Sequence, residues 1–449
     1  MQDLSNEKTV QMVKRVASVV VTVVIMIALR YSTLITESDP AVFSVTLLGL
    51  MLVLSFNIGK LLSRLNLPTL TIYLITGILC GPFVLGFLSS ATIDNLKFID
   101  TLALGLIAFI AGGELRVKEL LRLKKVLVSI SLMETLVVFI FCAVGFITIT
   151  PLLPFTQSQT FFLNSLIALI MAALLVANSP AVTIGIIGEY KSNGVLTETI
   201  LGSVIFKDII VIVLFATVTT FVMISLDSTA EWSMMVFIKT IGYEIGMSIV
   251  AGLGVGFLVY LYIRFIGEQP VLFVIGAAFM SYEIARQFHL EVLLVGVSAG
   301  FAVQNFTKQG EALVEHVEES LPIVYPIFFA IAGAKINLPL MLELWYLALF
   351  LTVIRVLGIY VGVRKGARLA SAPESVQKYA WMGFVSQAGV ALGLATIVNN
   401  KFPEWGGYLQ TILLSVIGIN QLVGPILLQR ALDKAGEISK PIPQSSILN

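Results

Sequence analysis

Charged side chains are scarce in this sequence: Asp, Glu, Lys and Arg make up only 12% of its 449 residues. Soluble domains carry about 25% charged residues, so this chain has too little charge to cover a surface that faces water. The 28 basic and 27 acidic residues nearly cancel, and without a basic domain nucleic-acid binding is excluded. Two histidines are too few for a histidine-based metal site.

Cysteine is also scarce, whereas apolar residues are abundant. Cys80 and Cys142 lie in separate apolar segments, where we expect both to be small buried hydrophobes. Hydrophobic residues make up 57% of the chain, and the mean hydropathy is +0.97. The composition therefore predicts an all-α polytopic membrane protein.

Long apolar runs recur along the whole chain. A membrane-spanning helix needs about 20 mostly apolar residues. Runs that approach this length are 16–36, 41–63, 68–88, 98–115, 126–150, 161–188, 198–225, 236–264, 270–286, 289–305, 319–342, 345–363, 376–400 and 408–431. Two adjacent runs, 270–286 and 289–305, are the weakest of the set, so we expect 13 or 14 transmembrane helices.

The distribution of Lys and Arg predicts the orientation in the membrane. With the N-terminus in the cytoplasm, 20 of the 28 basic residues fall on the cytoplasmic side and 5 on the outer side, as the positive-inside rule requires. An error of one span would exchange the sides of all later loops and remove this bias. We therefore expect cytoplasmic ends, 1–15 and 432–449, around a transmembrane domain over 16–431 in a cell membrane, the inner membrane of a bacterium.

Four ionisable residues lie deep within predicted spans: Glu134, Lys207, Asp208 and Arg355. Charge inside a bilayer is costly, so such residues are functional candidates by default. For Glu134 and Arg355 we expect charge compensation, in which Arg355 either stabilises a nearby helix interruption or pairs with Glu134. For Asp208 we expect ion binding, with a purely structural pairing to Lys207 as the alternative.

Two predicted spans are interrupted near their middle. Within 161–188, the segment Ala177–Ala181 contains Pro180, which removes a backbone donor and disfavours helix at Ser179. Within 376–400, polar side chains and a glycine fall at a similar depth: Ser386, Gln387 and Gly389. Two such breaks in corresponding positions of two halves point to a transport site at the midplane.

The two breaks lie in similar triplets of spans. Each triplet has a charged helix, a broken helix and a helix with a polar centre, which is Asp208 in the first triplet and Asn420 in the second. The triplets are 126–150, 161–188 and 198–225, and 345–363, 376–400 and 408–431. The first triplet begins inside the cell and the second outside, so we expect inverted repeats, which favour alternating access.

Several motifs in this order resemble the monovalent cation/proton antiporter superfamily, especially its Kef-like and bacterial sodium/proton members. The similar segments are Leu67–Pro82, Gly112–Leu115 with the basic stretch that follows it, Asn178–Ala181, Gly202–Asp208, Phe328–Gly333, Arg355 and Ser386–Ala391. Together they extend over about 41–431, nearly the whole chain, and their order and spacing make the resemblance specific.

The resemblance implies roles for particular residues and parts. Asp208 corresponds to the essential aspartate of the family's ion-binding helix, and a core of about 98–225 and 345–431 would move against a scaffold that forms a homodimer. The residue before this aspartate is usually Asp, Asn or Gln, whereas here it is Lys207. Ser203 stands where many electroneutral members have Glu. The resemblance therefore implies no particular ion or stoichiometry.

A carboxylate that binds either a proton or a dehydrated cation is the simplest group that can exchange the two ions. We expect Asp208 to be this group and the ligand of Na⁺ or K⁺, with oxygens of Ala177, Asn178 and Thr183 as further ligands. Lys207 would also face the site. If Lys207 stays protonated, exchange is electroneutral; if cation binding drives its proton off, exchange becomes sensitive to voltage.

These observations predict a secondary active antiporter that exchanges Na⁺ or K⁺ for protons by alternating access. We expect it to be no enzyme, to need no cofactor, and to have the cation, the proton, membrane lipid and a second copy as partners. The alternative is a non-transporting ion sensor or channel-like protein on the same scaffold, suggested by the positive charge of Lys207. An intramembrane enzyme is unsupported, because the sequence has no protease-like Gly-x-Gly-Asp, metal motif or nucleophile elbow.

Overall fold

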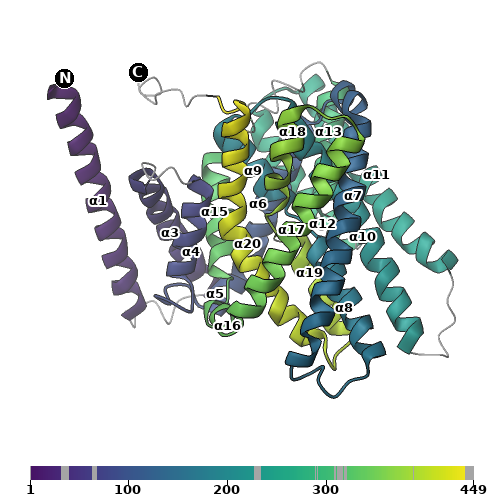
Figure 1. The fold of residues 1–449 in the computed structure, drawn as a ribbon. Helices are drawn as coiled ribbons and strands as arrows, with labels where there is room; N and C mark the ends of the chain where they lie inside the picture. The colour runs from purple at the N-terminus through teal and green to yellow at the C-terminus, as the bar shows by residue number, and fades with distance from the viewer. Residues whose placement is uncertain are drawn as a thin grey trace.

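The structure is a computed structural model that describes residues 2–31, 40–62, 68–226, 234–288, 292–307, 321–387 and 389–439, together with residues 290, 310 and 317. Within these ranges every regular element is a helix (Figure 1). The all-α polytopic membrane fold predicted from composition is therefore confirmed.

The helices follow the predicted apolar runs. The first half of the chain forms α1 (Gln2–Tyr31), α3 (Pro40–Leu62), α4 (Thr69–Cys80), α5 (Ser90–Asn95), α6 (Lys97–Glu114), α7 (Val117–Ile149), the 3₁₀ turn η2 (Thr150–Leu152), α8 (Phe161–Val176), α9 (Pro180–Tyr190) and α10 (Val195–Leu226). The second half forms α11 (Met234–Phe265), α12 (Pro270–Gln287), α13 (Val292–Phe306), α15 (Leu321–Ala334), α16 (Leu338–Glu343), α17 (Trp345–Leu369), α18 (Glu374–Tyr379), the 3₁₀ turn η3 (Ala380–Phe384), α19 (Gly389–Lys401) and α20 (Gly406–Ala435).

Length and composition mark many of these helices as membrane-spanning. Among the described residues, 8 helical stretches are long and apolar enough to cross a bilayer, and α4 and parts of α13 and α15 are shorter apolar helices. Each of the predicted runs overlaps at least one helix. Two runs are shorter as helices than predicted. The run 68–88 is helical only to Cys80, because Gly81 is extended (ψ 175°), and 319–342 divides into α15 and α16.

Both predicted interruptions are present. Helix α8 ends at Val176 and α9 begins at Pro180, the helix position where a missing N–H costs nothing. Ser179 caps α9 by accepting a hydrogen bond from the Val182 amide at 3.4 Å. In the second half η3 ends at Phe384 and α19 begins at Gly389. Each broken helix therefore has open backbone near its centre.

The first helices of the two triplets, α7 and α17, pack closely against each other. Gly366 of α17 lies beside Ile130 of α7, and Gly358 lies beside Val138. Rising numbers on α7 meet falling numbers on α17, so the two helices are antiparallel. This is the geometry expected of inverted repeats.

The remaining helices form further close pairs. Helix α4 packs on α15 and α3, and α6 packs chiefly on α13, which also contacts α11. In Figure 1 α3, α4 and α15 lie to one side of α20, and α7, α8 and α10 lie to the other. The two free cysteines, Cys80 and Cys142, are buried as predicted.

Large apolar side chains also cover the outside of the long helices. On α7, Leu132, Leu136 and Val144 are each more than half exposed. An extended apolar surface of this kind marks contact with an apolar phase, so these side chains lie where lipid tails would surround the protein.

Candidate functional site

The two interrupted helices meet at their breaks. The amide of Ser179, in the first break, donates a hydrogen bond to the carbonyl of Ser386, in the second, at 3.0 Å. Ser179 and Ser386 are both buried. At this crossing α8 and η3 end, and the last carbonyl groups of a helix have no partner within it. The crossing therefore brings together carbonyl ends with partial negative charge and, where α9 and α19 begin, amide ends with partial positive charge.

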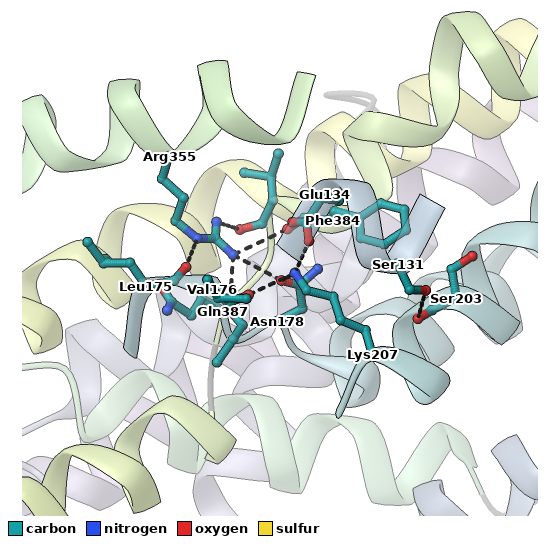
Figure 2. Close-up of polar contacts among 12 residues, drawn as sticks. Ser131, Glu134, Leu175, Val176, Asn178, Ser203, Lys207, Arg355, Phe384 and Gln387 are labelled. Carbon is teal, nitrogen blue, oxygen red and sulfur yellow. Dashed lines mark hydrogen bonds and ion pairs between the residues drawn. The ribbon is translucent and has the colours of Figure 1, made fainter. Parts of the chain in front are cut away.

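Arg355, fully buried on α17, lies against these carbonyls from both breaks (Figure 2). From the first break it reaches Leu175, to which its Nε donates at 2.7 Å, and Ala177, to which its Nη2 donates at 3.0 Å. From the second break it reaches Val385, to which its Nη1 donates at 2.7 Å, and Phe384, to which its Nη2 donates at 3.3 Å. One guanidinium thus joins the ends of two interrupted helices.

Lys207, on α10, is also fully buried. Its Nζ donates to the carbonyl of Val176 at 2.8 Å and to Oδ1 of Asn178 at 2.7 Å. It also forms an ion pair with the buried carboxylate of Glu134, on α7 (Figure 2). An ammonium group has three N–H donors, and Lys207 has three acceptors in these contacts. Its charge is balanced by Glu134.

A polar chain extends the site towards the last helix. Gln387, in the second break, donates from Nε2 to the carbonyl of Leu174 at 3.1 Å. Its Oε1 accepts a hydrogen bond from Nδ2 of Asn420, on α20, at 3.1 Å. Both side chains are fully buried. Asn420, the polar centre of the last predicted helix, is thereby joined to the crossing.

Asp208 follows Lys207 on α10 but lies in a different environment. Its side chain is half-buried rather than buried, and its charge interacts with that of Lys207. Successive residues of a helix point about 100° apart, which separates the two side chains. Thr183, buried on α9, donates from its hydroxyl to the carbonyl of Ser179 at 3.3 Å.

The structure shows which of the predicted site residues contact one another, a question that the sequence left open. The ion pair of Glu134 is with Lys207, whereas Arg355 donates to carbonyls and to Oδ1 of Asn178 at 3.3 Å. Of the two roles expected of Arg355, the structure therefore shows the contact with the helix interruption and not the ion pair with Glu134. Two predicted cation ligands, the Ala177 carbonyl and Asn178 Oδ1, already accept from cationic groups.

Several groups at the site have no signature in the sequence. The carbonyls of Leu174, Leu175, Val176, Phe384 and Val385 all accept buried hydrogen bonds there. Backbone acceptors carry no residue signature, so the signal available was the position of the breaks. The charge of Arg355 within an apolar run was a second signal, because a buried guanidinium needs acceptors of this kind.

Two crossing broken helices, held by buried ionic side chains within an all-helical membrane protein, define a transporter built on discontinuous helices. Residues 47–434 match the transmembrane sodium/hydrogen exchanger family. The chain belongs to this family, within the monovalent cation/proton antiporter superfamily.

Proteins that are similar to this chain in sequence or in fold are named as sodium/proton antiporters. The chain is 29% identical over 345 residues, 75% of its length and 86% of the relative's, to the probable Na⁺/H⁺ antiporter GerT of Bacillus cereus. It is 25% identical over 388 residues, 85% of its length and 95% of the relative's, to the Na⁺/H⁺-K⁺ antiporter GerN of the same organism. The sodium proton antiporter MjNhaP1 of Methanocaldococcus jannaschii has the same fold, with a TM-score of 0.64 at 18% identity, over 89% of this chain and 98% of that one.

Proposed function

We propose that this protein is a secondary active antiporter that exchanges Na⁺ or K⁺ for protons by alternating access. The observation that carries the proposal is the crossing itself: two helix interruptions joined at buried positions, with the half-buried Asp208 next in sequence to Lys207, whose ammonium contacts the first interruption. Family membership and the names of GerT and GerN support the class of reaction. The name of GerN is the support for K⁺ as well as Na⁺.

Asp208 is the group that we propose to bind cation and proton in turn. Glu134 is fully buried in an ion pair with Lys207, whereas the side chain of Asp208, the next residue on α10, is partly accessible. Because one carboxylate cannot hold both ligands, a proton leaves when a cation binds. The Thr183 hydroxyl donates its proton to a carbonyl and keeps lone pairs for a cation. Ala177 and Asn178 would join only by giving up contacts to Arg355 or Lys207.

The proposed moving core consists of α7 to α10 and α17 to α20. These helices make up the two inverted triplets, and their packing on one another supports treating them as one body. Helix α6, placed in the core by the sequence boundary at 98, packs chiefly on α13, so we assign it to the scaffold. Homodimerisation through the scaffold, both ends in the cytoplasm and a bacterial inner membrane remain parts of this proposal.

The alternative, a non-transporting sensor or channel-like protein, loses its main support. It rested on a net positive charge at the site from Lys207. The ion pair with Glu134 makes these two residues neutral together, so they leave no net positive charge to repel a cation.

Transport by purified protein in liposomes tests the proposal directly. A gradient of Na⁺ or K⁺ should drive proton movement with the wild type. Asp208→Asn should abolish it, because an amide cannot bind and release a proton in the pH range of the assay. The variant should keep the wild-type elution profile and melting temperature within a few degrees. Saturable exchange at the wild-type rate in Asp208→Asn would show that another group carries the ions.

A further inference from the structure

A second carboxylate joins elements far apart in the sequence. Glu189 lies in the last turn of α9, the half-helix that follows the first break. Its Oε1 accepts a hydrogen bond from the backbone amide of Thr69 at 2.6 Å, and its Oε2 accepts one from the amide of Leu70 at 3.3 Å. Thr69 and Leu70 are the first two residues of α4.

Glu189 supplies a cap that α4 does not provide for itself. The first amides of a helix need an acceptor from outside the helix, and the usual acceptor is a Ser, Thr, Asp or Asn side chain at the N-cap. The N-cap residue of α4 is Pro68, which makes no such bond. Lys60, on α3, adds an attractive charge near the Glu189 carboxylate.

This contact lies between the two parts that the proposed transport cycle would move. Helix α9 packs on α10 and α20 of the core, whereas α4 packs on α15 and α3 of the scaffold. The two surfaces are close along this boundary, since a Cβ at Gly185 of α9 would lie 2.6 Å from Leu70. The predicted topology puts this end of α9 and the start of α4 on the cytoplasmic side.

We propose that Glu189 is a positioning residue for ion exchange, which holds the cytoplasmic half of the broken helix against α4 and so stabilises the state closed to the cytoplasm. The inference rests on the proposed alternating access. Opening the cytoplasmic path would separate α9 from α4, and two helix amides would lose their acceptor. The cap therefore shifts the balance of states, and the balance sets the apparent affinity on each face.

The chain contains a matched control for this idea. Glu437, which follows α20, caps α10 in the same manner: its carboxylate accepts from the amides of Leu196 at 2.8 Å and Thr197 at 2.7 Å. This cap joins two elements of the core. Its loss should weaken packing without favouring either face.

The test compares Glu189→Gln with Glu437→Gln in membrane vesicles of both orientations. The quantity measured is the concentration of Na⁺ or K⁺ that gives half-maximal proton exchange when added at the cytoplasmic or the external face. For Glu189→Gln we expect this concentration to fall at the cytoplasmic face and rise at the external face, each by about threefold or more. For Glu437→Gln we expect no such opposite shifts.

A third variant breaks the same contact from the other side. Thr69→Pro removes the amide donor at the first position of α4, where proline is tolerated. Pro68 already has the extended conformation (ψ 135°) that a residue before proline requires. Thr69→Pro should shift the half-saturating cation concentration at each face in the same direction as Glu189→Gln does. If Glu189→Gln does not accumulate in the membrane, Thr69→Pro alone tests the proposal.

Unchanged half-saturation at both faces, or shifts of one sign at both, in Glu189→Gln and Thr69→Pro would overturn the proposal. Equal opposite shifts in Glu437→Gln would overturn it as well, because any loss of packing would then produce them. A wild type without cation-driven proton movement would instead overturn the proposed function.

Discussion

At the scale of single residues, the side chain of Arg355 donates hydrogen bonds to four backbone carbonyls at the crossing. Unsatisfied backbone groups within a membrane cost several kcal/mol each, and the crossing leaves the carbonyls of two interrupted helices without helical partners. The guanidinium has five N–H donors in a planar fork. Its contacts to Leu175, Ala177, Phe384 and Val385 use this geometry.

Arg355→Ala should lower the stability of the protein strongly. The change leaves buried carbonyls without donors and removes a compensating positive charge, and breaking a buried ionic network costs about 3–5 kcal/mol. We expect a clearly lower melting temperature in detergent, measured by intrinsic fluorescence. Arg368→Ala, at an exposed position of the same helix, should leave the melting temperature unchanged.

Arg355→Lys separates charge from geometry. A lysine ammonium keeps the charge but lacks the planar fork, so it should recover only part of the lost stability. If Arg355→Ala melts like the wild type while transport stops, Arg355 takes part in ion coupling instead of supporting the crossing.

At the scale of elements, the contact between α7 and α17 fixes the position of Glu134. Three glycines recur every fourth residue on α17: Gly358, Gly362 and Gly366. Small residues at this spacing allow helix backbones to approach closely in membranes. A Cβ at Gly362 would lie 2.6 Å from the Cα of Glu134, which is too close for two backbones to accept without moving apart.

Gly362→Ala should therefore separate α7 from α17 and destabilise the protein. Overpacking typically costs about 1–3 kcal/mol, and here the neighbour is backbone that cannot change rotamer. The prediction is checked by the melting temperature and by exchange activity, since Glu134 would be displaced from Lys207. Gly254→Ala on α11, where a Cβ meets nothing within 4 Å, is the control and should be neutral.

At the scale of the whole molecule, the buried charges decide how much charge each transport cycle moves. All three donors of the Lys207 ammonium have acceptors, one of them the Glu134 carboxylate. This favours a Lys207 that stays protonated, so that Asp208 alone exchanges its ligands. One proton then moves for each monovalent cation.

Exchange by the wild type should accordingly be electroneutral. Cation-driven proton movement in liposomes should have the same rate with and without an imposed membrane potential. The comparison is made for the wild type and for Lys207→Gln combined with Glu134→Gln, which keeps the buried pair neutral. A wild type that responds to potential, with a Lys207→Gln/Glu134→Gln double variant that does not, would show that Lys207 itself gains and loses a proton.

Local chemistry in the sequence was enough for much of this protein. Apolar run length predicted the membrane fold, and Pro180 and the segment around Gln387 predicted the two interruptions. These features depend on residues that are neighbours in the chain. Charge within apolar runs also identified the buried residues Glu134 and Lys207 without reference to any fold.

Tertiary structure decided which groups become partners. Arg355 and the Leu175 carbonyl are 180 positions apart, and Glu189 and the Thr69 amide are 120 apart. Such contacts depend on how helices pack, because a buried charge selects the acceptor that packing brings within reach. The sequence therefore determined that the membrane interior holds charges and open backbone. Only the packing of α7, α10 and α17 around the crossing decided that Lys207 binds Glu134 while Arg355 binds the ends of the interrupted helices.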